Sequence, residues 1–357
     1  MDDTSQEQQK RTYFTRLHVA GLLLTVFGVS LFVYFIYSVG FRDLWGGIER
    51  FGFLGFAIIL GLFFLRICAR AWAWKLSVHE PYTLKMRDTI PAVMIGEAMS
   101  STIPLGILIS GTAKAVAVRK RIPLVAGLSS VATENLFYSF TTGLFLILGA
   151  TLLLVTFATD ESLIATIYVL IGTLSVLIVL GVVMVIRQWH FASVTVNWLY
   201  KKGFLKRWLE HLRFEVRRFE DLIYGFYRRH PRRFIPICLI QVVYHVLGVA
   251  EVWIILTRLL GQPASVLNAF LLESVSRLIY IIFKLVPLMI GVDEAGAQYV
   301  GRTLALAAGT GITLAVIRKG RILFWTLIGM LLIVKRGLSL TEITRISHHE
   351  TTNALET

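Results

Sequence analysis

Long apolar stretches separated by short polar segments dominate this chain of 357 residues. The apolar stretches cover about 17–39, 51–76, 123–157, 162–186, 234–260 and 312–334. Each reaches the roughly 20 residues that an α-helix needs to cross the hydrocarbon core of a bilayer. None alternates apolar and polar residues in the way that the strands of an outer-membrane barrel do. The pattern therefore predicts an all-α polytopic membrane protein with about six transmembrane helices.

Two more apolar segments, residues 88–118 and 264–309, contain helix-breaking residues. Breaks are expected at Pro104 and Gly111 in the first segment and at Pro287 and Gly291 in the second. Interrupted backbone at membrane depth is tolerated only where protein or water satisfies its polar groups. We therefore predict a re-entrant helical hairpin in each segment. If a hairpin instead crosses the membrane completely, the number of spans rises by two and the termini stay on the same side.

Lysine and arginine concentrate in a few loops, and such loops stay in the cytoplasm. The basic loops are 75–87, 119–121 and 187–233, whereas Asp160 and Glu161 form an acidic turn. This distribution places both termini in the cytoplasm. The chain then divides into a cytoplasmic N-terminal arm (1–16), a first membrane half (17–186), a cytoplasmic basic amphipathic helix (187–233), a second membrane half (234–336) and a cytoplasmic tail (337–357).

The two membrane halves carry their features in the same order. Each half has a span with charges at membrane depth, then a hairpin with a glutamate, then a span with another charge. The corresponding spans 51–76 and 234–260 are expected to run in opposite directions. This order predicts an inverted repeat, a transporter architecture in which broken helices meet near the midplane. The alternative is a helical bundle whose halves share only their hydropathy.

Composition and charge agree with a membrane protein. The chain is 56% hydrophobic and 16% charged, with a mean hydropathy of +0.70, whereas soluble domains carry roughly 25% charged residues. About half of the net charge of +14 lies in residues 190–233, where apolar residues recur at steps of three or four. We expect this basic amphipathic helix to lie on the anionic inner leaflet. Membrane topology thus accounts for the positive charge, and no nucleic-acid partner is expected.

Charged residues at membrane depth form the candidate site, because such charges normally face a protein interior or a water-filled cavity. They are Arg66, Arg70, Glu97, Lys114, Glu134, Glu273, Arg277, Asp293, Glu294, Arg318, Lys319 and Arg321. A guanidinium group presents a fork of donors that suits a phosphate. The carboxylates are candidates for binding a cationic part of a headgroup or for carrying a coupling proton.

The same charges also have structural explanations. Asp293 and Glu294 can cap a helix, because the helix dipole favours acidic side chains at a helix N-terminus. Glu97 and Glu134 can form buried ion pairs with nearby basic residues. The basic trio that begins at Arg318 can mark the end of a span near the lipid headgroups.

We expect no metal and no cofactor. Cys68 and Cys238 both lie in apolar spans and have no metal-binding or disulfide spacing. His245 precedes Glu251 by six residues, and we expect it to be a satisfied interior histidine rather than a proton relay.

Residues in both hairpin segments resemble short sequence blocks of a known family. The first block is matched by Pro104, Gly111, Lys114 and Glu134, and the second by Pro287, Gly291, Glu294 and Arg318. Asn135 and Tyr138 stand where the family often has arginine and aspartate. The chain resembles the flippase-like membrane domain of lysylphosphatidylglycerol synthases and the stand-alone proteins that share it. The resemblance covers most of the chain and is clearest over 90–145 and 268–330.

The resemblance implies that the protein moves lipids between leaflets. In the long members this domain is thought to flip an aminoacylated phosphatidylglycerol made by a fused cytosolic transferase domain. This chain is expected to lack that domain, because its largest cytoplasmic segment is about 190–233. We therefore expect a transporter and not an enzyme.

The prediction is a lipid transporter in the cytoplasmic membrane of a bacterium or archaeon. An anionic or zwitterionic headgroup, from a phospholipid or a lipid-linked phosphate, would cross through a midplane polar groove while its tails stay in lipid. Its partners would be membrane lipids and a lipid-modifying enzyme, and its oligomeric state is left open. Two alternatives remain: an integral membrane enzyme acting on a polyprenyl-phosphate or another lipid-linked substrate, and a non-transporting protein that recruits enzymes through residues 190–233.

Overall fold

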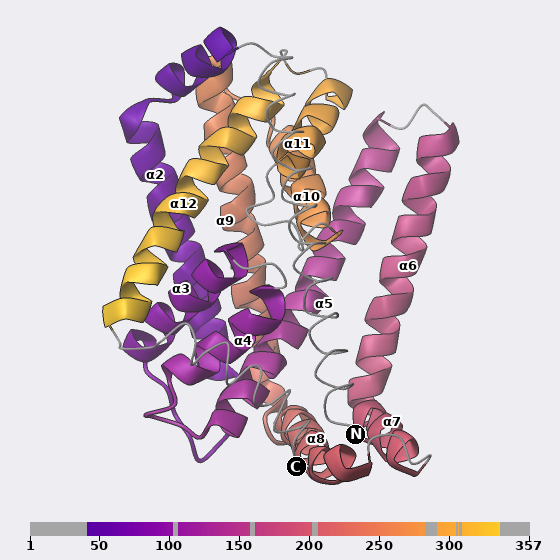
Figure 1. Cartoon of the computed structure of the whole chain (residues 1–357). Coiled ribbons are helices and arrows are strands. Elements are labelled where there is room, and N and C mark those ends of the chain that lie inside the picture. The colour runs from indigo at the N-terminus through magenta and orange to yellow at the C-terminus, as the bar shows by residue number, and fades with distance from the viewer. Residues whose placement is uncertain are drawn as a thin grey trace, which may run out of the picture.

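Every regular element in the described part of the chain is helical (Figure 1). The computed structural model describes residues 41–102, 106–157, 161–201, 206–282, 291–304, 306 and 309–335. The elements are α2 (Phe41–Leu76), α3 (Met86–Thr102), α4 (Gly106–Ala117), α5 (Leu124–Phe157), α6 (Glu161–Ile186), α7 (Phe191–Lys201), α8 (Lys206–Arg229), the 3₁₀-helix η1 (Pro231–Arg233), α9 (Phe234–Leu260), α10 (Val266–Ile282), α11 (Val292–Thr303) and α12 (Thr310–Lys335). The predicted all-α membrane fold is confirmed.

Four of the described helices are long and apolar enough to cross a membrane. Their candidate spans are Ile48–Leu76 in α2, Leu124–Thr156 in α5, Ile164–Ile186 in α6 and Pro231–Leu260 within η1 and α9. Helix α12 covers the predicted last span, but Arg318, Lys319 and Arg321 interrupt the apolar run. Several predicted features lie outside the described residues: the first span, the N-terminal arm, the tail, Pro104 and Pro287. The number of spans and the inverted repeat stay predictions.

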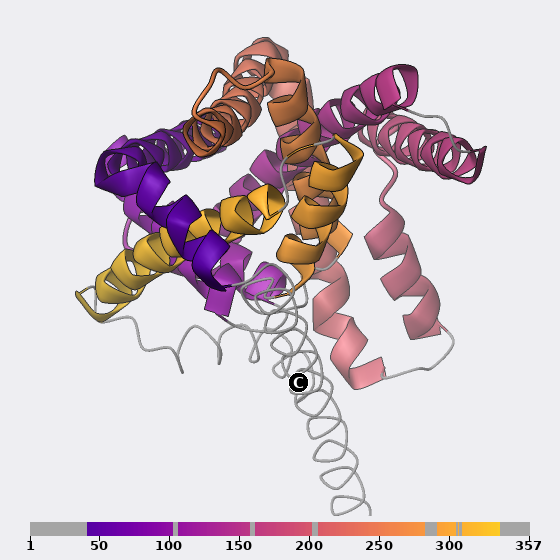
Figure 2. The same cartoon turned by 90° about the horizontal axis from the view of Figure 1, so that it is seen from above.

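Helices α2, α3, α9, α10 and α12 form the main body of the bundle, and α5 and α6 extend away from it on one side (Figure 2). Helix α2 packs along α9, α12 packs on α3, and α10 joins α9 to α5. The middle of α6 has no buried residue, and Val169, Val176 and Leu180 are exposed on it. An apolar helix without a buried face is expected to face lipid.

Helix α2 starts ten residues before the predicted span and bends where that span was expected to begin. Gly52 has φ 67° and ψ 168°, so α2 consists of two helical pieces that meet at this residue. A positive φ favours glycine, because glycine has no Cβ to clash with the backbone. The apolar piece after the bend, which contains Ile59 and Ile67, packs into the bundle.

The first predicted hairpin consists of two short helices that pack on each other, α3 and α4. They have 17 and 12 residues, which correspond to about 26 Å and 18 Å, less than the roughly 30 Å of the hydrocarbon core. Gly96 permits the close approach, because a Cβ there would lie 2.7 Å from Lys114 Cγ. The helix break expected at Gly111 is wrong, because α4 continues through that residue to Ala117.

The second hairpin segment contains α10 and α11, and α11 packs on α12. Gly291 has φ 82° and stands directly before α11. Gly311 lets α12 touch α11, because a Cβ at this position would collide with the backbone carbonyl of Ala297. Glycine thus allows α11 and α12 to make backbone contact at Gly311.

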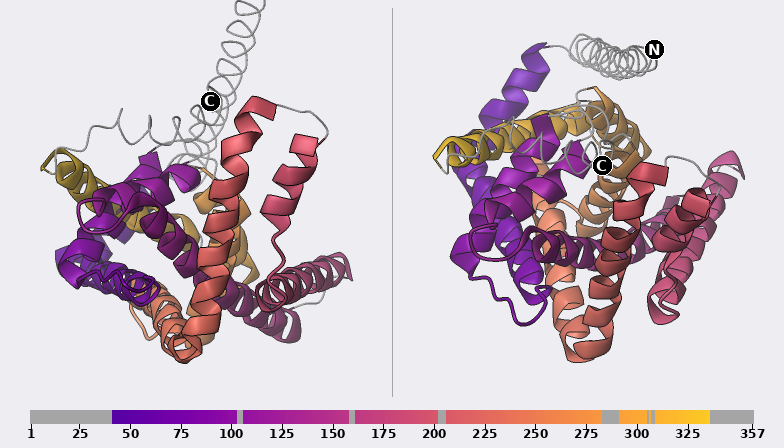
Figure 3. Two further views of the ribbon diagram at one scale, coloured as in Figure 1. Left: turned by 90° about the horizontal axis from the view of Figure 1, so that it is seen from below. Right: turned by 60° about the horizontal axis from the view of Figure 1, so that its bottom comes forward.

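The described part of residues 187–233 contains α7, α8 and the short η1 instead of the single helix that we predicted. Helices α7 and α8 pack on each other at one end of the bundle (Figures 1 and 3). The pair is held by a His190 Nε2–Asp221 Oδ1 contact of 2.8 Å and by the Tyr224 hydroxyl, which donates to the Trp189 carbonyl at 2.6 Å. Phe226 packs in a core with Phe137 of α5. Part of the apolar stripe therefore contacts protein rather than lipid.

Replacing Gly329 by alanine should destabilise the contact between α12 and α3. A Cβ at Gly329 would lie 2.6 Å from both the Met94 carbonyl oxygen and Ala98 Cβ, and backbone atoms cannot move aside cheaply. We expect a loss of about 1–3 kcal/mol, measured as a lower melting temperature in detergent. Gly172→Ala on α6 is the matched control, because nothing lies within 4 Å of its added Cβ. Equal melting temperatures for the two variants would contradict this packing.

Candidate functional site

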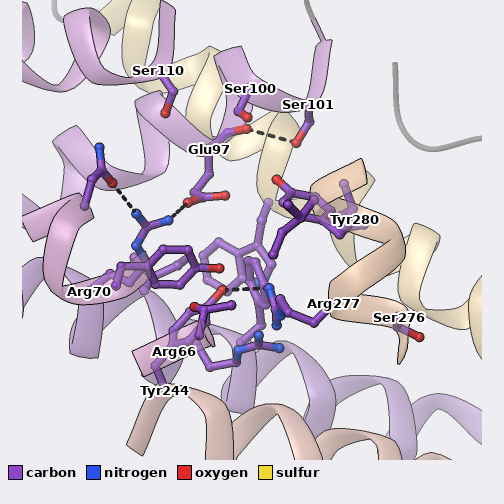
Figure 4. Close-up of a pocket in the computed structure, with 18 of the residues that line it drawn as sticks. Arg66, Arg70, Glu97, Ser100, Ser101, Ser110, Tyr244, Ser276, Arg277 and Tyr280 are labelled. Carbon is purple, nitrogen blue, oxygen red and sulfur yellow. Dashed lines mark hydrogen bonds and ion pairs between the residues drawn. The ribbon is translucent and has the colours of Figure 1, made fainter. Parts of the chain in front are cut away.

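A cavity of about 530 Å³ lies inside the helical bundle (Figure 4). Its lining comes from α2 to α6 and from α9 to α12, so both predicted membrane halves contribute to it. The volume is in the range of small-molecule binding pockets, about 300–1,000 Å³. Most of the charged residues that the sequence pointed to converge around this cavity or directly behind its wall.

The cavity wall carries more positive than negative side chains. The described basic residues on it are Arg66, Arg70, Lys114, Arg277, Arg318 and Arg321. The described acidic residues on it are Glu97 and Asp293. Four other predicted site residues do not line the cavity: Glu134, Glu273, Glu294 and Lys319. The wall therefore has a formal surplus of four positive charges.

Glu273 on α10 holds three of these arginines from behind the wall. Its Oε1 accepts from Arg277 Nη2 at 2.5 Å and from Arg66 Nη2 at 3.5 Å, and its Oε2 accepts from Arg318 Nη2 at 2.9 Å. The Glu273 side chain is fully buried. One carboxylate thus connects α2, α10 and α12 around the cavity.

Glu251 on α9 has the same role and was missing from the predicted site. Its Oε2 accepts from Arg66 Nη1 at 3.1 Å, and its carboxylate also binds Arg321 of α12. Like Glu273, Glu251 is fully buried. A glutamate inside the apolar stretch 234–260 was a signal that could have identified it, and its partner Arg66 is 185 residues away in sequence.

A second ion cluster joins α2 to α3, α4 and α5. Arg70 Nη1 donates to Glu97 Oε1 at 2.7 Å, and Arg70 Nε donates to Glu134 Oε1 at 3.3 Å. Lys114 Nζ lies 3.9 Å from Glu134 Oε2, and Gln241 donates to Glu134 at 3.0 Å. Glu134 is therefore a buried structural anion, as the alternative explanation held, whereas Glu97 faces the cavity.

Glu294 and Asp293 have different surroundings although they are neighbours. Glu294 accepts from the backbone N–H of Gly291 at 2.8 Å and binds Lys319 of α12. It caps α11 and ties it to α12. Asp293 lines the cavity. The helix-cap explanation thus describes Glu294, and Asp293 remains a cavity residue.

Aromatic rings support the guanidinium groups on the wall. Arg66 Cζ lies 4.4 Å from the ring centre of Tyr244, and Arg70 Cζ lies 4.7 Å from that of Tyr138. Arg321 Cζ lies 4.2 Å from the ring centre of Phe63. Cation–π contacts of this kind stabilise cations and fix their orientation. Each ring lies on a different helix from its arginine, so these pairs could not be predicted from the sequence.

Several donors of these arginines have no partner. Four buried nitrogens make no hydrogen bond with the described residues: Arg66 Nε, Arg277 Nε, Arg318 Nη1 and Arg321 Nε. Buried polar groups are almost always satisfied by protein, water or a ligand. These nitrogens are themselves enclosed by protein, so the surplus positive charge of the wall is what indicates that the cavity can attract an anion.

Nothing in the described segments holds a metal ion, because no three His, Cys, Asp or Glu residues cluster there. His245 is buried, its Nε2 lies 3.1 Å from Thr142 Oγ1, and it stacks on Phe145 at 4.7 Å between ring centres. His245 is thus interior as expected but not fully satisfied, because its buried Nδ1 makes no hydrogen bond with the described residues.

Fold and site define the class as an all-helical membrane protein with a buried, positively charged cavity. The chain matches the family described as lysylphosphatidylglycerol synthase TM region over residues 18–329 and belongs to it. The resemblance noted from the hairpin motifs is therefore confirmed, and the protein is a membrane protein of a family concerned with lipid handling. No curated protein and no solved structure matches the chain.

Removing the Glu273 carboxylate should destabilise the whole bundle. In Glu273→Ala, Arg277 and Arg318 lose their charged partner, and unpaired buried charges cost about 3–5 kcal/mol. We expect a strongly lowered melting temperature in detergent. Glu161→Ala, at the exposed start of α6, should change stability by less than about 1 kcal/mol. A Glu273→Ala protein as stable as the unmodified protein would show that this ion cluster does not hold the helices together.

Proposed function

We propose that the protein is a lipid transporter that moves a phosphate-bearing headgroup between the two leaflets. The headgroup crosses through the cavity, and its hydrocarbon tails stay in the surrounding lipid. The observation that carries this proposal is the cavity wall, with six basic and two acidic side chains inside a membrane-embedded bundle. An apolar solute gains nothing from such a wall.

The position of the carboxylates supports an anionic ligand. Glu251 and Glu273 hold the arginines from behind and are fully buried, so they take no part in the cavity surface. Arg66, Arg277, Arg318 and Arg321 still reach the cavity wall with these partners present. A phosphate oxygen accepts strong, charge-assisted hydrogen bonds from such groups.

The geometry also supports binding without a large rearrangement. Ion pairs and aromatic rings hold the arginines in place before any ligand arrives. Preorganised groups bind with less loss of conformational entropy. A purely structural ion cluster needs no cavity of about 530 Å³ beside it.

In this proposal the two short helix pairs, α3–α4 and α10–α11, are re-entrant elements that form opposite walls of the transport path. They carry Glu97, Lys114 and Arg277. The positive-inside distribution orients the basic α7–α8 end toward the cytoplasm of a bacterial cell. Transport of this kind requires no catalytic group, so the proposal assigns no enzyme activity.

Neutralising the cavity arginines should slow lipid exchange. In proteoliposomes with fluorescent phosphatidylglycerol, Arg277→Gln and Arg318→Gln should each lower the exchange rate at least about tenfold, because a hydrogen bond to a charged group contributes about 1.5–3 kcal/mol. Glu273 keeps two arginine partners in each variant, so the fold should be retained. Arg187→Gln, at an exposed position after α6, is the matched control and should exchange lipid at the original rate.

Two outcomes would contradict the proposal. Equal exchange in all variants would mean that the cavity is not the path. No exchange of any lipid by folded protein, with or without a proton gradient, would favour the membrane-enzyme or partner-protein alternatives. Melting temperatures of all variants, measured beforehand, separate loss of transport from loss of folding.

A further inference from the structure

We infer that one edge of the cavity is a subsite for a hydrocarbon chain, so that the ligand is a lipid held by headgroup and chain together rather than a soluble anion. This inference rests on the proposed transport function and names the place where the chain lies. We call this part of the lining the apolar edge. It is formed by Gly143 and Leu146 of α5, Leu174 of α6 and Ile281 of α10.

The lining changes from polar to apolar along α5. The residues of α5 that line the cavity have the spacing of a single helix face, and in chain order they are Asn135, Tyr138, Ser139, Thr142, Gly143 and Leu146. The first four carry an amide or a hydroxyl, whereas the last two have no polar side-chain atom. A ligand that lies along this face therefore meets polar groups at one end and apolar surface at the other.

Helix α10 shows the same change within one turn. Its cavity-lining residues are Ser276, Arg277, Tyr280 and Ile281. Residues four positions apart on a helix have Cβ atoms about 5–6 Å from each other, so Ile281 neighbours Arg277 on this face. Figure 4 shows Arg277 and Tyr280 on the same side of the cavity. A phosphate bound at Arg277 would thus have the first carbons of its lipid beside Ile281.

The apolar edge also faces outward. Leu174 lies in the middle of α6, in the apolar segment that has no buried residue. Helix α6 packs on α5, where a Cβ at Gly143 would lie 2.8 Å from Ile178 Cδ1, one turn from Leu174. Ile281 is 47% exposed although it lines the cavity. The cavity is therefore bounded here by side chains on the outer surface of the bundle.

A second apolar part of the lining is closed from behind. Four residues between α2, α3 and α12 line the cavity and also pack in the hydrophobic core of these helices: Phe63, Ile67, Met94 and Trp325. No residue of the apolar edge belongs to any hydrophobic core formed by the described residues. The apolar edge is thus the apolar part of the described lining that a chain can pass without displacing a core.

The transport task explains why such an edge is needed. A lipid that changes leaflet must bring its phosphate past the middle of the bilayer while its chains stay in apolar surroundings. Drawing a chain across the basic wall would take polar groups away from their partners, which is costly. An apolar edge one turn from Arg277 avoids this cost. A soluble anion has the same phosphate chemistry but gains nothing from the edge.

Filling the apolar edge should slow lipid exchange. In proteoliposomes with fluorescent phosphatidylglycerol, Leu174→Trp and Ile281→Trp should each lower the exchange rate at least about tenfold, because the indole takes the place of the chain. Leu177→Trp and Ile282→Trp are the matched controls, since both residues are exposed on the same two helices and do not line the cavity. They should change the rate less than about twofold.

Unchanged exchange in Leu174→Trp and Ile281→Trp, or an equal loss in all four variants, would overturn the chain subsite. If exchange in that case still depends on Arg277 and Arg318, the transport function stands without the subsite. Melting temperatures of the four variants, measured beforehand, show that each one is folded.

A binding measurement separates the chain from the headgroup and needs no transport. Short-chain phosphatidylglycerol should raise the melting temperature of the purified protein in detergent. Glycerophosphoglycerol, which is the same headgroup without acyl chains, should not do so at equal concentration. Leu174→Trp and Ile281→Trp should abolish the stabilisation, and the two control variants should keep it.

Equal stabilisation by glycerophosphoglycerol would identify a soluble anion as the ligand and overturn the inference. Stabilisation by the short-chain lipid that survives in Leu174→Trp and Ile281→Trp would also overturn it. If binding depends on the apolar edge but the unmodified protein exchanges no lipid, the transport proposal fails and the chain subsite is retained.

Discussion

Two fully buried carboxylates, Glu251 and Glu273, are the constraint on which the rest of the structure depends. Between them they bind four arginines from α2, α10 and α12, and Arg66 binds both. Burying this many charges is expensive unless each has a partner. Two carboxylates cannot neutralise four guanidinium groups, so the cluster keeps a net positive charge. The helices are therefore held together by an ion network that remains able to attract an anion.

Small residues make this network possible. Gly248 of α9 faces the carboxylate of Glu273, and a Cβ there would lie 3.3 Å from Arg66 Cζ and even closer to the carboxylate. Gly96, Gly311 and Gly329 let α3, α11 and α12 approach their neighbours to backbone contact in the same way. Within a membrane, helices associate through close packing and polar contacts rather than through the hydrophobic effect. The glycines and the ion network therefore depend on each other, because the charges pair only where the backbones come close.

Hydropathy and charge were enough to predict the helical membrane fold and the eight charged residues on the described cavity wall. The sequence could not separate residues on the cavity wall from residues behind it. Glu97 and Glu134 are both glutamates in apolar segments. In the structure Glu97 faces the cavity, whereas Glu134 is enclosed by Arg70, Lys114 and Gln241. Glu251 was left out although it is a charge inside an apolar stretch, and its pairing with Arg66, 185 residues away, is seen only in the fold. Gly111 was taken as a break because glycine weakens helices on average, but packing against neighbouring helices overrides that preference at this position.

The partial neutralisation of the arginines matters for transport itself. A site that carries a substrate across a membrane must bind it well enough to let it enter and weakly enough to let it leave. Arginines without any carboxylate partner would hold a phosphate too tightly, and fully neutralised arginines would not attract it. In the proposed transport, a phosphate would share Arg318 and Arg277 with Glu273 and compete with that carboxylate for their donors. The buried carboxylates would then both hold the bundle together and limit the affinity of its cavity, so the stability of the protein would be tied to the rate at which it releases its ligand.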